Sequence, residues 1–439
     1  MKIAWFSPLP PQRSGISDYS ELILKYLRDL ATVDLWVGGF SPQAHYYRDF
    51  RVINYDEQAH VLPLLKTYDA VVYHMGNNAD FHAGIYEVFR EYPGVVVLHD
   101  YVLHHLFYEY WLNVRKNSEG YLEEVGRQYG TAVRESARKG LQPFSKLLCE
   151  RDDVFLYPLN RSIIKQARGV IVHSDFVKGL VENDAGGPVI RLHHPYDPAS
   201  GLNGKSSRKE LGLPEDKLLL ASFGYMTLNK RIERVLEVIA QQTSLRERVC
   251  YLLIGEAAPG CDLPGSIARY NLTEQVRLLG YLSLDEALTY LNCADICINL
   301  RYPTMGETSG GLIRILALGK PAIVTNIGWY AELPDDCVIK IDSGEREEDS
   351  LANALLLLAN DAELRDKLGA AALSYVRNNY SVQNFVKGLL DFLEQLTPGD
   401  EDGHYWRLLD RLTDIMIEFG ADKSSLPVQI SRQLTWAKS

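Results

Sequence analysis

Short apolar runs alternate with helical patterns along most of this chain, and this alternation restricts the fold more than any other feature. The intervening patterns, such as 17–30 and 232–241, have the spacing of amphipathic helices. Strand–helix alternation predicts α/β domains in which parallel sheets carry helices on both faces. The candidate strands are 3–7, 33–38, 70–74, 95–99, 169–173 and 189–192, followed by 218–224, 249–255, 276–280, 296–300, 322–325 and 337–341.

A stretch rich in Gly, Ser, Lys and Pro, residues 198–213, interrupts the alternation and is predicted to link two domains. The length of 439 residues also favours two hydrophobic cores over one. We expect two doubly wound, Rossmann-like α/β domains, 1–200 and 201–397, facing each other across a cleft, and a C-terminal helical extension over 398–439. Ligands of such sheets bind beyond the carboxyl ends of the strands, here in the cleft. Residues 114–150 form a charged helical insertion, expected to be a solvated or packing element, with acceptor recognition as the alternative.

The composition argues against several classes of protein. The net charge of −11 is unsuited to nucleic acid, whose binding needs a basic face. No apolar run reaches about 18 residues, so we expect no membrane span, although a local basic patch would still allow peripheral association. The chain opens on a predicted strand, which indicates no signal peptide and a cytoplasmic location. The six cysteines include no close pair with metal-ligand spacing, and Cys293 and Cys297, which are four residues apart, are expected to pack in the core.

The stretch 303–325 combines a glycine-rich turn, an apolar helix over 312–318 and a further strand. Because the turn follows the strand 296–300, it places several backbone N–H groups at a helix N-terminus, an arrangement that binds phosphate. The turn also holds a carboxylate, Glu307, which would be out of place if phosphate were the sole ligand. A carboxylate suits a polyol bound beside the phosphate. The stretch therefore predicts a site for a sugar joined to a diphosphate.

Two other loops that follow predicted strands carry candidate ligand groups. Gly15 lies where glycine lets the backbone approach a ligand closely, and Ser17 is a predicted N-cap, although a capped helix without a ligand explains both residues equally well. Lys230 and Arg231 stand at a helix start, where cations oppose the helix macrodipole unless they meet an anion. Such a pair is otherwise a common surface feature, but its place beyond a strand favours diphosphate binding.

Eight of the 11 histidines lie at or near strand ends of the first half, which predicts a shared role in the cleft. Asp100 directly follows one of them, His99, and could orient the imidazole or hold a hydroxyl group. The rival interpretations are packed core histidines and a metal site. A metal site needs a convergent set with close spacing, which these residues lack, so we expect no metal. The eight are His74, His82, His99, His104, His105, His173, His193 and His194.

Together these residues resemble those of glycosyltransferase family 4, in the group 1 form found in one bacterial subgroup. Enzymes of that family have the two-domain GT-B fold and transfer sugars with retention of anomeric configuration, so the resemblance implies both here. The likeness covers most of the chain, and its more specific motifs lie in the second domain. The stretches that carry it are 14–19, 76–77 with His82, 98–104, 303–321 and 328–335.

The resemblance implies a role for each matching residue. His99 would lie near the transferred sugar and the acceptor, Lys230 would neutralise the diphosphate leaving group, and Glu307 would lie near the donor sugar hydroxyl groups. These three are the expected catalytic residues. The expected donor-binding residues are Gly15, Gly224, Arg231, Ser309, Gly310, Gly311, Leu312 and Arg314, and the expected acceptor-side residues are Asn77, His82, Asp100 and His173.

Two positions depart from the family pattern. Tyr225 stands where the family usually has an arginine after the first strand of the second domain. Arg314 stands where a glutamate usually holds the nucleotide ribose, and arginine cannot accept hydrogen bonds. Either another acceptor, for which Glu332 is a candidate, holds the ribose, or the nucleotide is bound differently.

The expected function is that of a retaining glycosyltransferase which moves a sugar from a UDP- or GDP-linked donor to an acceptor hydroxyl. The acceptor would be a carbohydrate, a lipid-linked molecule or a protein, in bacterial polysaccharide, glycolipid or glycoconjugate synthesis. No Asp-x-Asp motif follows a predicted strand, so we expect metal-independent catalysis without a cofactor. The alternatives are a sugar-nucleotide hydrolase or epimerase, and a non-catalytic sugar-nucleotide-binding or scaffold protein on the same fold.

Overall fold

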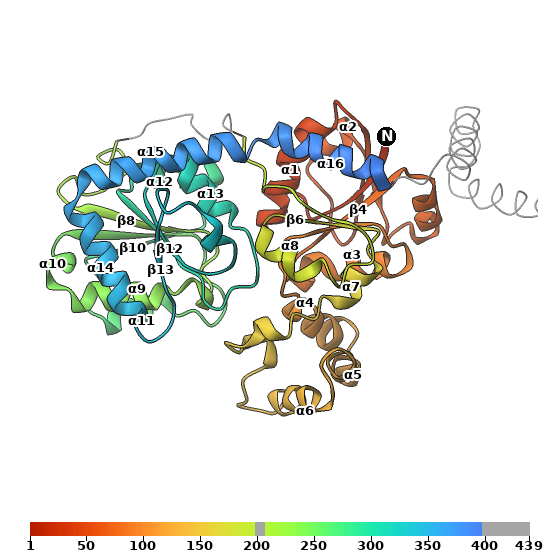
Figure 1. Ribbon diagram of the computed structural model, residues 1–439, viewed down its shortest axis with the longest axis horizontal. Coiled ribbons are helices and arrows are strands. Elements are labelled where there is room, and N and C mark those ends of the chain that lie inside the picture. Colours follow the sequence, from red (N-terminus) through yellow and green to blue (C-terminus); the bar gives the residue numbers. More distant parts are fainter. Residues whose placement is uncertain (198–206, 397–439) are drawn as a thin grey trace, which may run out of the picture.

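The computed structural model describes residues 1–197 and 207–396. The predicted extension over 398–439 and residues 198–206 of the predicted linker lie outside these residues. The chain forms two α/β domains, each around one parallel sheet, as the sequence predicts (Figure 1). None of the described helices is long and apolar enough to cross a membrane.

The first domain contains a seven-stranded sheet in the order β3-β2-β1-β4-β5-β6-β7. All its pairings are parallel, and the central strands are buried on both faces, which explains their continuous apolar sequences. The six strands predicted in this half are present, and the short edge strand β3 was missed. The strands are β1 (Lys2–Phe6), β2 (Thr32–Val37), β3 (Arg51–Asn54), β4 (Ala70–Met75), β5 (Val95–Leu98), β6 (Gly169–Val172) and β7 (Val189–Arg191).

Helices cover both faces of this sheet. One face packs against α1 (Gly15–Leu27), α2 (Ala44–Asp49) and α16 (Val382–Leu396), and the other against α3 (Ala79–Glu91), α4 (His104–Glu109), α7 (Arg161–Gln166) and α8 (Asp175–Val181). The expected N-cap at Ser17 is wrong. The cap of α1 is Ser14, whose Oγ accepts the N–H of Ile16 at 3.2 Å, because the helix begins at Gly15, two residues before the predicted start at residue 17.

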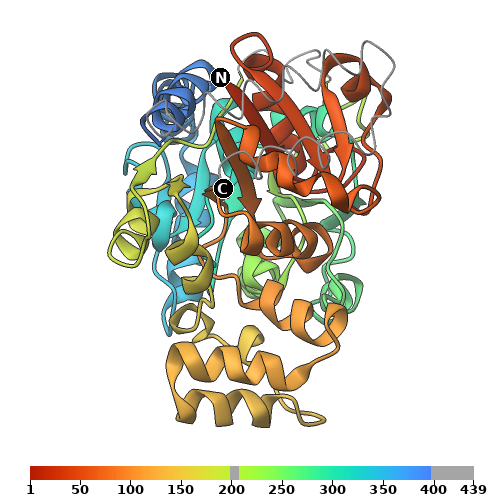
Figure 2. The ribbon, with the colours of Figure 1, turned by 90° about the vertical axis from the view of Figure 1, so that its right-hand side faces the viewer.

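The predicted insertion is helical and projects from one end of the first domain (Figures 1 and 2). It contains α5 (Ser118–Tyr129) and α6 (Thr131–Gly140), which pack against each other. Tyr121 and Val125 of α5 join the core beneath the sheet, whereas Arg134 and Arg138 of α6 form ion pairs with Glu119. The insertion is thus fastened to the domain through one apolar face.

The second domain contains a six-stranded parallel sheet in the order β10-β9-β8-β11-β12-β13. All six strands correspond to the apolar runs predicted in this half. They are β8 (Leu218–Phe223), β9 (Val249–Ile254), β10 (Val276–Gly280), β11 (Ile296–Asn299), β12 (Ala322–Thr325) and β13 (Ile339–Ile341). One face carries α9 (Ile232–Gln241), α10 (Thr243–Arg246), α11 (Leu263–Arg269) and α14 (Glu347–Asn360), and the other carries α12 (Leu284–Cys293), α13 (Gly310–Ala317) and α15 (Ala362–Asn379).

The chain returns to the first domain through α16, although its residues fall within the range predicted for the second domain. At the crossing, the N–H of Val382 donates to the carbonyl of Tyr196 at 3.1 Å, and the N–H of Tyr196 donates to the carbonyl of Tyr380 at 2.7 Å. Phe385, Leu389 and Leu393 are buried against the outer face of the first sheet. Chain connections at both ends of the second domain therefore tie it to the first.

Because α16 contributes only its apolar face to the first domain, truncating that face should destabilise the protein. We expect Leu389→Ala to lower the free energy of unfolding by about 2–5 kcal/mol, the usual cost of removing a fully buried leucine side chain. Urea unfolding followed by circular dichroism measures it. Glu394→Ala, at an exposed position of the same helix, should stay within about 0.5 kcal/mol of the parent protein. Equal stability of the two variants would contradict the prediction.

Candidate active site

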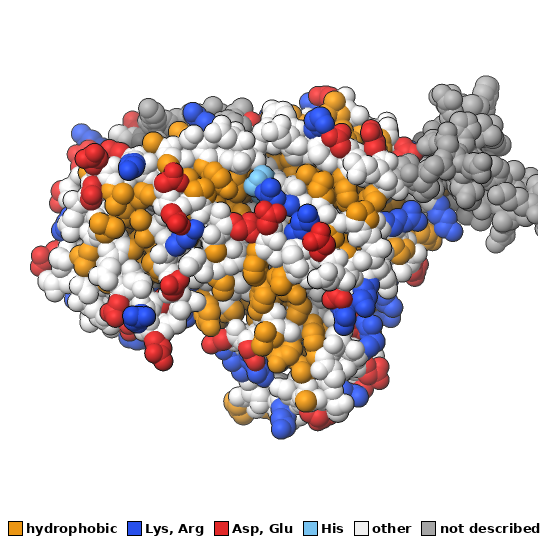
Figure 3. All heavy atoms as spheres, viewed as in Figure 1, with side chains coloured by type: hydrophobic (Ala, Val, Ile, Leu, Met, Phe, Trp, Pro, Cys, Tyr) orange, Lys and Arg blue, Asp and Glu red, His pale blue; other side chains and the backbone are white. Residues whose placement is uncertain are grey.

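The loop that follows β5 in the first domain touches the loop that follows β11 in the second. The N–H of Val102 donates to the carbonyl of Met305 at 2.9 Å. Gly306 has a positive φ of 74°, and a Cβ there would lie 2.4 Å from the Cβ of Tyr101, so only glycine fits. These contacts place His99 and Asp100 on one side of the domain interface and Glu307 on the other. In Figure 3, acidic and basic side chains gather where the two domains meet.

The carboxylate of Glu307 is held by four donors of its own domain. One oxygen accepts from Arg301 Nε at 2.9 Å and from the Tyr330 hydroxyl at 3.4 Å. The other accepts from Thr304 Oγ1 at 3.1 Å and from the N–H of Met305 at 2.7 Å. The glycine-rich turn therefore fixes this carboxylate in one orientation before any ligand binds.

Arg301 is a site residue that the sequence reasoning missed. It directly follows Leu300 at the carboxyl end of β11, and its side chain is nearly buried beside Glu307. The available signal was its position, because ligands of parallel sheets bind beyond such strand ends. The same reasoning had singled out His99 after β5.

Lys230 lies in the same group of charges. It is 8% exposed, and its Nζ donates to the carbonyl of Phe223 at 2.5 Å. Burial lowers the pKa of Lys230 well below its usual value, Arg301 lowers it further, and Glu307 opposes both. Gly224, with a φ of 97°, leaves room for the ammonium, since a Cβ there would lie 2.9 Å from Nζ. Lys230 and Arg301 thus face one carboxylate, and an anion bound beside them would favour the charged form of Lys230 that burial disfavours.

Asp100 experiences these charges from across the interface. Burial raises the pKa of its carboxyl to about 7, and the nearby Glu307 carboxylate adds to the shift. The N–H of Asn77, which donates to Asp100 Oδ2 at 2.9 Å, and the Arg301 guanidinium act in the opposite direction. The structure therefore brings Asp100 together with Lys230, Arg301 and Glu307.

The other acceptor-side candidates have structural partners. The side-chain oxygen of Asn77 accepts the N–H groups of His105 and Leu106 at the start of α4, at 3.0 and 3.2 Å. His82 donates through Nδ1 to the carbonyl of His74 at 3.0 Å, and His173 donates to the carbonyl of Leu192 at 2.8 Å. Burial lowers the pKa of both histidines to about 4, so both rings are neutral.

A buried tyrosine gathers four of the strand-end histidines. The ring centroid of Tyr19 in α1 lies 5.6 Å from that of His74, 4.7 Å from His99, 5.3 Å from His173 and 5.0 Å from His194. The predicted convergence of histidines is therefore present. Within residues 1–197 and 207–396, no group of three or more His, Cys, Asp or Glu side chains is placed to hold a metal ion.

The N-terminus of α13 meets the first domain at Asp18. Ser309 caps this helix, accepting the N–H of Leu312 at 3.1 Å, and Gly310 lies against the ring of His194. Arg314 lies 3.7 Å from the carboxylate of Asp18. Burial raises the pKa of Asp18, and Arg314 lowers it in part.

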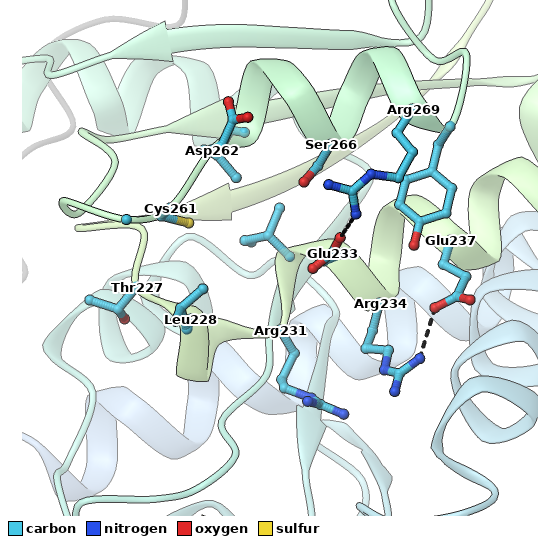
Figure 4. Close-up of a pocket in the computed structure, with 14 residues that line it drawn as sticks. Thr227, Leu228, Arg231, Glu233, Arg234, Glu237, Cys261, Asp262, Ser266 and Arg269 are labelled. Atoms are coloured by element: carbon cyan, nitrogen blue, oxygen red, sulfur yellow. Dashed lines mark hydrogen bonds and ion pairs between the residues drawn. The ribbon is translucent and has the colours of Figure 1, made fainter. Parts of the chain in front are cut away.

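Two further candidates have partners elsewhere. Arg231 forms a two-pronged ion pair with the buried Glu347 and lines a pocket of about 540 Å³ between η5 (Leu228–Lys230), α9 and α11 (Figure 4). Its charge is therefore matched away from Glu307. The carboxylate of Glu332 accepts the N–H groups of Asp175 and Phe176 at the start of α8, so it joins the domains instead of standing open to a ribose.

The Asp100 carboxyl should impose a pH dependence on stability. Its pKa is raised in the folded state, so between about pH 4 and pH 7 the folded chain binds a proton that the unfolded chain has released, and stability falls as the pH rises through this range. Asp100→Asn removes this effect. We therefore expect the difference in melting temperature, variant minus parent protein, to be more positive at pH 8 than at pH 4. Asp216→Asn, at an exposed position, is the control. The same difference at both pH values would contradict the assignment.

Part of the chain is similar in sequence to known glycosyltransferases. Residues 204–374 match the family model described as glycosyl transferases group 1. A stretch of 136 residues is 25% identical to the O-antigen biosynthesis glycosyltransferase WclY of Escherichia coli, covering 31% of this chain and 36% of the length of that relative. The chain thus aligns with about a third of this curated relative.

Solved structures resemble the whole described chain. Sucrose-phosphate synthase from Thermosynechococcus elongatus has a TM-score of 0.63 at 16% identity, covering 90% of this chain and 99% of that one. Anabaena HepE, solved in complex with UDP-glucose, has a TM-score of 0.62 at 17% identity, covering 90% of this chain and 100% of that one. At such identities the likeness establishes the fold. The chain therefore has the GT-B fold, and its second domain carries the match to the group 1 glycosyl transferases.

Proposed function

We propose that this protein is a retaining glycosyltransferase that moves a sugar from a nucleotide-diphosphate sugar to an acceptor hydroxyl. The observation that carries the proposal is the meeting of Lys230, Arg301 and Glu307 with His99 and Asp100 between the two domains. Two buried basic side chains beside fixed hydrogen-bonding groups suit a reaction in which negative charge develops on a departing diphosphate, because that charge would favour the charged form of Lys230.

Departure of the leaving group is the step that most needs stabilisation. Lys230 and Arg301 would neutralise the charge on the diphosphate, assisted by the N–H groups at the start of α13. Arg301 would supply the cation that Tyr225, an exposed side chain, does not. Because both cations are already buried, little reorganisation is needed as the bond breaks.

The sugar would lie between Glu307 and His99. Glu307 would bind its hydroxyl groups while keeping Arg301 in place. With retention and no enzymic nucleophile, the acceptor attacks from the face that the diphosphate leaves, and the leaving phosphate assists its deprotonation. Closure of the domains on the donor excludes water. In this proposal the reaction takes place in the cytoplasm and needs neither a metal ion nor another cofactor.

The donor and acceptor classes rest on the relatives. HepE has been solved with UDP-glucose, which supports a UDP-linked donor, with a GDP-linked donor as the alternative. WclY acts in O-antigen biosynthesis, which supports a carbohydrate or lipid-linked acceptor in bacterial polysaccharide synthesis. Asp18 would hold the ribose hydroxyl groups, because it is the carboxylate that lies beside Arg314.

Removing either charged group at the centre of the site should abolish most of the activity. We expect Lys230→Ala and Glu307→Ala each to lower the transfer rate by about 10²–10³-fold, the usual loss when a group that stabilises developing charge is deleted. Product formation with the preferred donor measures the rate, and circular dichroism checks the fold. Lys209→Ala, at an exposed position, should behave like the parent protein. Near-parental rates in both site variants would overturn the proposed site.

A thermal-shift panel of nucleotide sugars should identify the donor. A ligand at about 100 times its dissociation constant stabilises the native state by about 2.7 kcal/mol. We expect UDP and UDP-glucose to raise the melting temperature more than GDP-mannose, and Asp18→Asn to reduce the shift caused by UDP. A shift with no turnover on any acceptor would favour a non-catalytic binding protein. Release of free sugar or an isomer without an acceptor would favour a hydrolase or epimerase.

A further inference from the structure

Three buried histidines of the first domain and the partly buried His194 carry their ring proton on Nδ1. In each, Nδ1 lies within hydrogen-bond distance of a backbone carbonyl: His82 with His74 at 3.0 Å, His104 with Tyr157 at 2.6 Å, His173 with Leu192 at 2.8 Å and His194 with Pro195 at 3.1 Å. A carbonyl oxygen only accepts, so Nδ1 must donate. Burial lowers the pKa of all four, which keeps the rings neutral and leaves Nε2 without a proton.

His74 differs because its Nδ1 faces another imidazole. It lies 2.9 Å from Nε2 of His99, and burial lowers the pKa of both rings, so the two neutral groups share one proton in this contact. Either His74 donates through Nδ1, or His99 donates through Nε2. The choice determines which nitrogen of His99 carries the proton.

The surroundings of His74 decide between these two assignments. Its Nε2 is buried and has no hydrogen-bond partner. If His99 donated, that atom would be a buried N–H without an acceptor, a costly and rare arrangement in proteins. If His74 donates, the atom is a bare lone pair. His173 shows that this core tolerates such an atom, because its Nε2 is equally buried and without a partner while its Nδ1 donates.

His99 therefore accepts at Nε2 and, being neutral, carries its proton on Nδ1. Its ring is only partly buried, and in the part of the chain that the structure describes its side-chain hydrogen bond is the one that Nε2 makes with His74. The ring packs edge-on against Tyr19. His99 directly precedes Asp100 in the loop that touches the second domain. The open nitrogen of His99 is thus a hydrogen-bond donor.

We propose that His74 is a positioning residue that fixes His99 as the Nδ1–H tautomer, so that His99 donates a hydrogen bond to an oxygen of the donor sugar or of the acceptor. This inference rests on the proposed transferase function. It assigns a polarity to His99 that excludes a role as general base through Nδ1, because a nitrogen that carries a proton cannot accept one. Deprotonation of the acceptor is then left to another group, in agreement with assistance by the leaving phosphate.

Two variants of His74 separate tautomer control from packing. Asn places its amide nitrogen where Nδ1 stands and can donate to His99, whereas Gln extends its amide to the position of Nε2. We expect His74→Gln to lower kcat for acceptor-dependent UDP release from UDP-glucose about 10-fold with little change in KM, the order of one lost hydrogen bond. His74→Asn should restore most of that loss. Equal losses in the two variants would overturn the positioning role.

Nitrogen NMR of the full-length protein labelled at histidine tests the tautomer without any substrate. The signal of His99, identified by its loss in His99→Asn, should show a protonated Nδ1 in the parent protein and in His74→Asn, and a changed or mixed tautomer in His74→Gln. A protonated Nε2 in the parent protein would overturn the inference even if transfer occurs. If no nucleotide sugar is turned over, the proposed function fails, and the NMR result alone decides whether His74 fixes His99.

Discussion

The ion pair between Arg301 and Glu307 is the interaction on which the rest of the site depends. It removes two charges from water at the edge of the second domain, and such burial is tolerated only with good geometry and additional hydrogen bonds. The glycine-rich turn supplies these bonds to the carboxylate. Lys230 lies beside this pair, and burial disfavours its charged form. An anion bound between the domains would complete the set, so ligand binding and domain closure favour each other.

The histidines of the first domain provide the opposite kind of environment. Burial keeps them neutral, so they line their side of the interface with polar but uncharged groups. The neutral histidines thus add no positive charge to that of the second domain. Asp100, whose pKa is raised to about 7, is likewise partly protonated near neutral pH and adds less than a full negative charge.

The sequence predicted the sheets because strands buried on both faces are continuous apolar runs, and it missed β3 because an edge strand such as Arg51–Asn54 carries polar residues. It placed Glu307 and Lys230 together because both follow strands of one sheet. The partners of other candidates could not be predicted, because they lie far away in the sequence. Arg314 pairs with Asp18, and Arg231 pairs with Glu347. Glu332 accepts a hydrogen bond from the start of α8. Local patterns identify a charged group but not the distant group that neutralises it.

Under the proposed function, an arginine on a neighbouring strand would compensate for the departure at Tyr225. In the family pattern an arginine follows the first strand of the second domain, here β8. In this chain the arginine follows β11, which pairs directly with β8. The carboxyl ends of neighbouring parallel strands meet at one edge of the sheet, so a cation can move between their loops and still reach the same point in space. Arg301, beside Lys230 and Glu307, satisfies this condition, whereas Arg231, which is nearer to Tyr225 in sequence, is held by Glu347.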